Sequence, residues 1–283
     1  MAIGRRVVVS AHANTTGAKP HLVVTITARS CMPTPLSNTL AKLVRSLHRR
    51  KGRREQGAFL AEGERLIREL AQNPTSVEFL FGMEDRAEWL QEQFGTRIPI
   101  HLVGWGNDSL FATENAQGVG AVVRIPEPIP TQQALSEPKP WLYLDALADP
   151  GNVGTIIRTA AWFGWGGVML GEGTADLYNP KTVRATMGAM FTLPVCADIP
   201  FETLAAANRP LIALDGNGAE QLGQLLLPPN GIFVIGNEAH GISQHVRQQA
   251  TLLRIPGVGN VESLNAAMAS SILCYELFRQ QSA

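Results

Sequence analysis

Short apolar runs and amphipathic stretches alternate along this chain in two blocks, which predict two folded units. The first block begins with a helical pattern that places three leucines on one side, and Ser37 or Asn38 can cap this helix. Strand-like runs follow at residues 57–63, 77–81, 98–103 and 119–125, with helical stretches between them. Residues 37–125 therefore predict a small α/β domain.

Residues 126–140 separate the two blocks. Five of these fifteen residues are prolines. Because proline lacks an N–H group and has a fixed φ angle, we expect neither a helix nor a central strand here. The segment is predicted to be an extended, semi-rigid linker.

The second block, residues 141–283, alternates strand-like and helical patterns from end to end. Such alternation predicts an α/β sheet covered by helices on both faces, with ligands at the C-terminal ends of the strands. Strands are expected at residues 141–145, 167–170, 193–196, 211–214, 232–235 and 252–255, and helices at 153–163, 181–190 and 263–279.

Residues 1–36 differ from both blocks, because they contain no acidic residue and no long amphipathic pattern. Their apolar run after Arg5 and Arg6 is too short for a secretory signal peptide, although the composition would suit an organellar transit peptide. We expect a disordered extension, or a start codon placed too early, with Met32 as the alternative start.

Charge is balanced over the whole chain but not along it. The chain is 45% hydrophobic and 17% charged, which is typical of globular proteins, and no run of 18 apolar residues predicts a membrane span. Residues 1–60 hold 11 Lys and Arg against one acidic residue, Glu55. We expect the densest basic cluster to contact RNA phosphates, with a solvated charged face as the alternative. The cluster consists of Arg45, Arg49, Arg50, Lys51, Arg53 and Arg54.

Several common kinds of site are missing from the sequence. Cys31, Cys196 and Cys274 form no CxxC pair and the six histidines no HExxH motif, so we expect no metal, and a reducing compartment, the cytoplasm. Gly257 and Gly259 are followed by Glu262, which breaks the dinucleotide fingerprint. With no P-loop and no GxSxG elbow, NTPases, hydrolases and metalloenzymes are all disfavoured.

Three loops of the second block are rich in Gly, Asn and small polar residues. In the first loop, Asn152 is expected to cap the following helix, and Arg158 lies within the first two turns of that helix. Taken alone, Arg158 would be a surface arginine beside an acid, and His240 an exposed loop residue. The loops are residues 149–158, 231–243 and 255–265.

Together the three loops resemble the motifs of the SpoU family of RNA 2′-O-ribose methyltransferases, within the SPOUT superfamily. Residues 59–63 and 116–119 are similar to the family's RNA substrate-binding domain, so the resemblance covers residues 37–283. One departure is Gly257-Val258-Gly259, where many relatives carry Met after the proline. The matching motifs are Asp149-Pro-Gly-Asn152-Val-Gly154-Thr-Ile-Ile-Arg158, Gly236-Asn-Glu238-Ala-His-Gly241-Ile-Ser243, and Ile255-Pro256 with Glu262-Ser263-Leu264-Asn265.

The resemblance implies an α/β fold in which a small α/β RNA substrate-binding domain precedes a trefoil-knotted SPOUT methyltransferase domain. It implies methyl transfer from S-adenosylmethionine to a ribose 2′-hydroxyl of RNA, with ribosomal RNA slightly preferred over transfer RNA. It also implies a homodimer and no metal. The implied cofactor contacts are Gly236, Asn237, Ile255 and Leu264.

Five residues carry the implied catalytic roles. Arg158 is the base that removes the hydroxyl proton or a clamp that stabilises the developing negative charge. Asn152 positions the arginine or the ribose, and Glu238 orients Arg158 or a neighbouring backbone group. Ser263 and Asn265 form hydrogen bonds near the ribose.

Two alternatives belong to other functional classes. A catalytically silent RNA-binding paralogue would keep the fold and lose the reaction residues, all five of which are present here. An ordinary Rossmann methyltransferase or dehydrogenase would need a glycine fingerprint at its first strand. Loss of cofactor binding with intact RNA binding would indicate the first, and nicotinamide binding the second.

Overall fold

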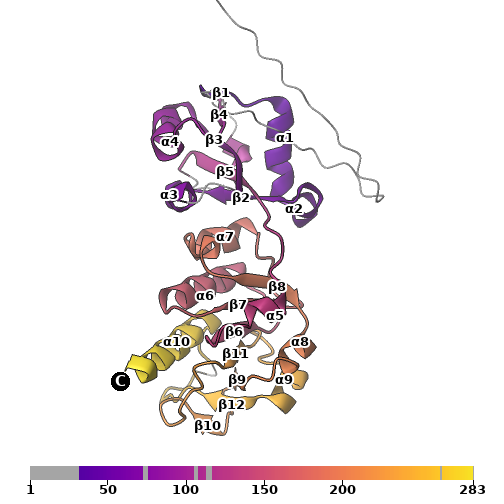
Figure 1. The fold of residues 1–283 in the computed structure, drawn as a ribbon, viewed down its shortest axis with the longest axis vertical. Coiled ribbons are helices and arrows are strands. Elements are labelled where there is room, and N and C mark those ends of the chain that lie inside the picture. Colours follow the sequence, from indigo (N-terminus) through magenta and orange to yellow (C-terminus); the bar gives the residue numbers. More distant parts are fainter. Residues whose placement is uncertain (1–31, 73–75, 105–107, 113–116, 262, 283) are drawn as a thin grey trace, which may run out of the picture.

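The computed structural model describes residues 32–72, 76–104, 108–112, 117–261 and 263–282 of the chain. These residues form two α/β domains, each built on its own sheet, with helix α7 (Pro180–Thr186) of the second domain at the seam between them (Figure 1). Most of the predicted extension, residues 1–31, lies outside the described residues. No helix among the described residues is long and apolar enough to cross a membrane.

The first domain contains β1 (Thr34–Pro35), α1 (Asn38–Leu47), α2 (Arg50–Gln56), β2 (Ala58–Glu62), α3 (Glu64–Gln72), β3 (Val77–Met83), the 3₁₀ turn Glu84–Arg86, α4 (Ala87–Phe94), β4 (Ile100–Val103), the 3₁₀ turn Asp108–Leu110 and β5 (Val119–Arg124). The strand order is β1-β4-β3-β5-β2, and β5 runs antiparallel to both of its neighbours. Alternate residues of each strand face opposite sides. Helix α1 therefore packs on one face of the sheet, and α3 and α4 pack on the other.

Strand β1 places residues 34–36 with the first domain, just before its expected start at residue 37. It pairs in parallel with β4, and the Leu36 N–H donates to the Leu102 carbonyl at 2.9 Å. Apolar alternation could not reveal it, because a period of two needs about four residues to be recognised. Ser37 caps α1 as predicted, since its hydroxyl accepts the Leu40 N–H.

The helix expected to continue from Ser37 into the basic cluster ends instead at Leu47, and α2 begins at Arg50. The Gly52 backbone lies so close to α1 that a Cβ there would be 2.0 Å from the Ser46 carbonyl oxygen. The Arg53 guanidinium donates to the carbonyls of Leu47 and His48 at 2.9 and 3.0 Å. The end of α1 is thus satisfied by a side chain of the next helix, which no local pattern indicates.

The second domain contains β6 (Trp141–Leu144), α6 (Pro150–Trp162), β7 (Gly167–Gly171), α7, the 3₁₀ turn Ala189–Phe191, β8 (Val195–Ile199), α8 (Phe201–Ala205), β9 (Leu211–Leu214), β10 (Glu220–Gln221), β11 (Ile232–Ile235), α9 (Gln244–Gln249), β12 (Thr251–Arg254) and α10 (Ala266–Ser282). All its strand pairs are parallel, in the order β10-β12-β9-β11-β6-β7-β8. Helices α6 and α10 cover one face, and α8 and α9 cover the other, as predicted.

This strand order differs from the Rossmann arrangement. In the second domain β11, not β9, lies beside the first strand β6, so the chain passes over one position and then returns to it. The classical dinucleotide-binding order, 3-2-1-4-5-6, places the fourth strand beside the first, and the fourth strand of this domain is β9. The dehydrogenase alternative is therefore disfavoured by topology as well as by the missing fingerprint. The knotted path that the resemblance implies stays a prediction.

Three predicted boundaries need correction. The linker contains a short helix, α5 (Thr131–Ala134), because no proline lies between Pro130, its N-cap, and Pro138. Helix α6 begins at Pro150, not Val153, because Asp149 is its cap and accepts the Asn152 N–H at 2.8 Å. Asn152 therefore lies inside the first turn and Arg158 just past the second. Helix α7 ends at Thr186, where Met187 and Gly188 take positive φ angles.

The two domains share an apolar contact. Val183 of α7 belongs to the buried core of the first domain, and the Tyr178 ring lies 4.8 Å from that of Phe59 on β2. Beside this contact, Arg53 of the first domain pairs with Asp176 of the second at 2.5 Å. We call the surface formed by these contacts the domain seam.

Candidate active site

Three of the predicted catalytic residues meet in one hydrogen-bonded row at the edge of the second sheet. Asn152 Nδ2 donates to Glu238 Oε1 at 2.9 Å, and Asn265 Nδ2 donates to Asn152 Oδ1 at 3.1 Å. Glu238 follows β11, Asn152 follows β6, and Asn265 precedes α10, so each of the three loops contributes one member. We call Glu238, Asn152 and Asn265 the amide row.

The direction of the amide row is fixed at both ends. Asn265 Oδ1 accepts the N–H groups of Ala267 and Met268 at the start of α10, so its NH₂ group must face Asn152. A carboxylate accepts only, so the NH₂ group of Asn152 must face Glu238. The orientations of both side-chain amides therefore follow from which of their neighbours can donate and which can only accept.

Glu238 joins the loops after β6 and β11. Its carboxylate accepts the backbone N–H groups of Ala148 and Asp149 at 3.0 and 3.1 Å, besides the amide of Asn152. Partial burial acts to raise the pKa of Glu238, but these hydrogen bonds outweigh it and the pKa lies below the usual value. Glu238 is thus an ionised loop clamp, which corresponds to the expected role on a neighbouring backbone group rather than on Arg158.

The loop after β11 is closed on itself. Gly236 is needed there because a Cβ would lie 2.3 Å from the Gly241 carbonyl carbon. The backbone of the same loop thus approaches Gly236 closely, so a nearby ligand is not the only reason for a glycine at this position. The Asn237 side chain donates to the Ala146 carbonyl at 2.7 Å and accepts the N–H groups of Ala239 and His240. Of the predicted cofactor residues, Asn237 thus has its side chain committed to the loop.

Arg158 lies on the exposed side of α6. Within the described part of the chain, no hydrogen bond or ion pair engages the Arg158 guanidinium. The alternative interpretation, a surface arginine paired with a neighbouring acidic residue, is therefore not supported. One turn further along α6 is Trp162, whose side chain is 84% exposed. Arg158 is therefore free to contact a substrate or a partner.

The third loop leaves its backbone available. Ile255 is half-buried against the core, whereas Ser263 and Leu264 are exposed, and Glu262 lies outside the described residues. Where the structure describes the stretch from Pro256 to Leu264, its backbone makes no hydrogen bond to the rest of the chain. Unused backbone groups beside exposed apolar side chains suit a nucleoside ligand, which needs an apolar slot and polar partners.

Three further residues at this edge were given no role by the sequence analysis, although Asp149 stands in the first motif. Asp145, at the end of β6, accepts the Ser243 N–H at 2.6 Å and so fixes the start of α9. Asp149 pairs with Lys181 of α7 at 2.7 Å, and the hydrogen bond from Lys181 lowers the pKa of Asp149. For Asp145 the available signal was its position at the end of a predicted strand, and for Asp149 its position in the loop that follows. Among the described residues, no group of His, Cys, Asp or Glu could hold a metal ion.

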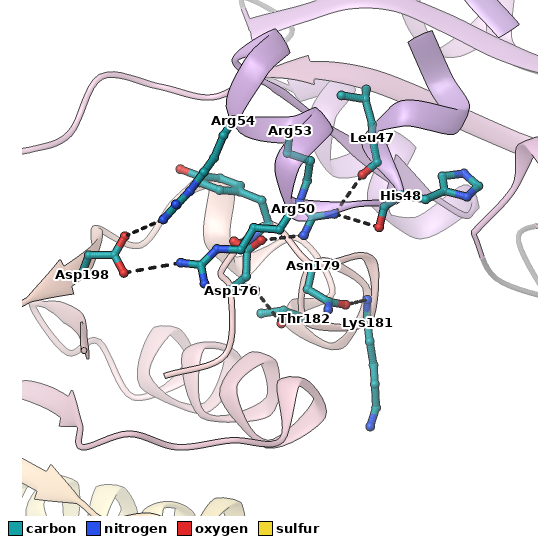
Figure 2. Close-up of polar contacts among 11 residues, drawn as sticks. Leu47, His48, Arg50, Arg53, Arg54, Asp176, Asn179, Lys181, Thr182 and Asp198 are labelled. Atoms are coloured by element: carbon teal, nitrogen blue, oxygen red, sulfur yellow. Dashed lines mark hydrogen bonds and ion pairs between the residues drawn. The ribbon is translucent and has the colours of Figure 1, made fainter. Parts of the chain in front are cut away.

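The basic cluster divides at the domain seam. Arg53 is buried and bound to Leu47, His48 and Asp176, so the fold already engages the guanidinium that was predicted to contact RNA (Figure 2). Arg50 and Arg54 are at least half exposed and approach Asp198 at 3.7 and 3.8 Å. The other members are exposed to different degrees: Arg45, Arg49 and Lys51.

Both domains match known families. Residues 139–275 match the SpoU rRNA Methylase family, and residues 38–104 match the MRM3-like substrate binding domain. The 23S rRNA (guanosine(2553)-2′-O)-methyltransferase of Bacillus subtilis is 34% identical over 257 residues, which cover 85% of this chain and 96% of that protein.

Solved structures agree over the same length. The SpoU methyltransferase AviRb from Streptomyces viridochromogenes, in complex with the cofactor AdoMet, has a TM-score of 0.77 at 27% identity, covering 87% of this chain and 99% of that one. An AdoMet-bound rRNA methyltransferase from Sinorhizobium meliloti has a TM-score of 0.75 at 28% identity, covering 89% and 98%.

Proposed function

The chain belongs to the SpoU family of RNA methyltransferases, and on this premise we propose that it methylates a ribose 2′-hydroxyl of ribosomal RNA, with S-adenosylmethionine as the methyl donor. The observation that carries the proposal is the amide row, which joins Glu238, Asn152 and Asn265 from three separate loops. A silent paralogue would have no need to keep both this row and an exposed Arg158 that has no partner among the described residues. Ribosomal rather than transfer RNA is favoured because the similar Bacillus subtilis protein is named for 23S rRNA.

Arg158 stabilises the reacting oxygen in this proposal. The cofactor, when bound, supplies a methyl group on a positively charged sulfur. As the 2′-oxygen forms a bond to the methyl carbon, the carbon–sulfur bond breaks and the hydroxyl proton passes to solvent water. Negative charge develops on the oxygen as its proton departs. An arginine side chain has five N–H donors and no acceptor, so its natural contribution is hydrogen bonding to an oxyanion or a neighbouring phosphate. The exposed, unpaired position of Arg158 fits this clamp role better than that of a base.

The third loop and the glycine after β11 are the proposed cofactor site. Ile255 and Leu264 would provide the apolar slot, while Gly236 and the unused backbone of the third loop would provide polar partners. Ser263 would bind the ribose, and this role is supported by its exposure two residues before Asn265. Asn237 acts indirectly, by holding the loop in shape.

RNA is proposed to lie along the basic face of the first domain, against Arg45, Arg49, Arg50, Lys51 and Arg54. These side chains retain exposed charge, whereas Arg53 does not. Neutralised phosphates release counterions, so the affinity should fall steeply with salt concentration. The cytoplasmic location expected from the cysteine pattern stays a prediction.

A homodimer formed through α10 is also part of the proposal. Its outward face carries a stripe of exposed apolar side chains, and two of them, Tyr275 and Phe278, lie against Phe163, the residue after the exposed Trp162 of α6. Such contiguous apolar surface is typical of an interface. Arg158 lies on the same side of α6 as Trp162, so the partner would border the active site. The stripe consists of Met268, Ile272, Tyr275 and Phe278, and Leu264 is exposed just before the helix.

The substitution Met268→Glu tests the dimer. It should convert the protein to a monomer in sedimentation equilibrium, because a buried charge would replace an apolar contact. The matched control is Met32→Glu, an exposed methionine of the first domain. A protein that is monomeric without any substitution would contradict the dimer but not the methyltransferase activity.

The activity itself is tested with purified protein, labelled S-adenosylmethionine and unmodified transcripts of large-subunit ribosomal RNA, with transfer RNA transcripts in parallel. We expect one 2′-O-methylated nucleotide in the ribosomal transcript. Methylation of transfer RNA alone would overturn the substrate, and cofactor binding without methylation of either RNA or of ribosomal particles would favour the silent paralogue.

A further inference from the structure

The three arginines of α2 that lie at the domain seam have different surroundings. Arg53 points into the seam and is fully engaged, whereas Arg50 and Arg54 point outward and converge on one carboxylate, Asp198 of β8 (Figure 2). Asp198 belongs to the second domain, 144 residues after Arg54. One acidic side chain thus faces two cations from the other domain.

These two ion pairs are loose. Their N–O separations of 3.7 and 3.8 Å are beyond hydrogen-bonding range, whereas the Arg53–Asp176 pair measures 2.5 Å. The side chains of Arg50, Arg54 and Asp198 are all at least half exposed. Exposed pairs of this kind contribute little to stability, so their purpose is not to hold the domains together.

The arginines surround a cavity of about 290 Å³ at the seam, lined in part by Tyr178 and Asp198. A water molecule occupies about 30 Å³ in the liquid, so the cavity has room for a group the size of a phosphodiester. Arginine forms two-pronged hydrogen bonds with phosphate oxygens, a geometry that neither Arg50 nor Arg54 achieves with Asp198.

The backbone of Asp198 is also unusual. Its φ angle is +55°, in the left-handed region, and it lies where the pairing of β8 with β7 shifts register. Residues with a side chain rarely adopt this conformation, although Asp and Asn tolerate it best. Strain of this kind that persists in a fold is a reason to look for function.

We propose that Asp198 is a built-in competitor for RNA: it occupies Arg50 and Arg54 in the free protein, and an RNA backbone phosphate displaces it at the domain seam. The inference rests on the proposed function and deepens it, because it names the phosphate site and the group that guards it. The carboxylate would weaken binding of all RNA, so that only an RNA that makes further contacts along both domains is bound tightly.

The test is RNA binding by the full chain, measured by fluorescence anisotropy with a labelled, unmodified transcript of large-subunit ribosomal RNA. Asp198→Asn removes the charge and keeps a residue that tolerates a positive φ angle, so the fold is preserved. We expect affinity to rise about three- to tenfold, the range that two exposed ion pairs can account for. Glu202→Gln is the matched control, since Glu202 is similarly exposed four residues further on and faces His245 instead of arginine.

A double-mutant cycle separates competition from general charge repulsion. In an Arg50→Ala/Arg54→Ala background, affinity should fall and Asp198→Asn should then gain no more than Glu202→Gln does. The slope of log affinity against log salt should become shallower by about one per arginine removed.

If Asp198→Asn binds no better than Glu202→Gln while both still methylate RNA, the competitor role is wrong and the methyltransferase assignment stands. If Asp198→Asn binds RNA more weakly, Asp198 is a positioning residue and the inference is overturned. If the unsubstituted protein binds neither ribosomal nor transfer RNA, the proposed function fails together with the inference.

Discussion

At the domain seam, Arg53 is buried, and its guanidinium reaches two carbonyls and one carboxylate; on helix α6 of the second domain, Arg158 is exposed and unpaired within the described residues. The sequence suggested a ligand contact for both. The difference shows that an arginine's role is decided by how many partners the fold already gives it. Where the fold satisfies the guanidinium, its loss should affect stability, and where the fold leaves it free, its loss should affect chemistry.

The largest effect is expected from Arg53→Ala. Removing Arg53 leaves the partly buried Asp176 uncompensated and the end of α1 unsatisfied, so the free energy of unfolding should fall by about 3 kcal/mol. Chemical denaturation measures this directly. Arg54→Ala, one residue further along the same helix but exposed, should change stability by less than about 0.5 kcal/mol. Equal midpoints for the two variants would mean that the seam does not depend on Arg53.

Arg158→Ala should produce the opposite pattern. Loss of a donor to a developing oxyanion costs about 10²–10³-fold in turnover, while melting temperature and cofactor affinity should stay unchanged. Single-turnover methylation and calorimetric titration with S-adenosylmethionine measure the two quantities. Arg124→Ala, an exposed arginine of the first domain, serves as the control. A variant that keeps full turnover would remove Arg158 from the mechanism.

Asn152→Asp should give an intermediate effect, with a loss of local stability and a loss of turnover. The new carboxylate would face Glu238 with an acceptor where a donor is needed, which we expect to loosen the loops after β6 and β11 by about 1–3 kcal/mol. Hydrogen exchange should show faster opening of these loops, and turnover should fall while RNA affinity does not. Unchanged exchange in the loops would show that the amide row is not what holds them.

The smallest effect is expected from Glu238→Gln, and it depends on pH. Because the native pKa of Glu238 is lowered, the carboxylate contributes stability that is fully present above its ordinary pKa of 4.5 and is lost as the pH falls through the lowered value. Thermal melts between pH 7 and 3 should therefore fall more steeply for the unsubstituted protein than for Glu238→Gln. Parallel curves would contradict the lowered pKa.

Local patterns predicted the main elements well where burial alone determines them. Strands such as Trp141–Leu144 are apolar throughout and buried throughout. The three loops rich in glycine and asparagine meet at one edge of the second sheet, where the amide row lies. The break between α1 and α2 was missed because it depends on Gly52 meeting Ser46 and on the side chain of Arg53. These contacts are tertiary, and no periodicity carries them.

The candidate site divides in the same way. The motif residues Asn152, Glu238 and Asn265 could be named from the sequence, but their order in the row and the direction of each amide could not. The pairing of Arg53 with Asp176 and of Arg54 with Asp198 depends on how the two domains pack. The partners in each pair are more than a hundred residues apart in the sequence. Sequence patterns identify which side chains could bind a ligand or take part in a reaction. Only the packing shows which of them are left without a partner inside the protein.

Strand β1 has a consequence for how the protein should be handled. It covers the outer edge of β4, and Pro35 within it has no N–H group to offer to another strand. A chain shortened to Ser37 would uncover the row of unpaired backbone groups on β4, a template for edge-to-edge association between molecules. Two residues at the start of the fold thus act as a guard against aggregation, and a truncation placed at Met32 keeps them.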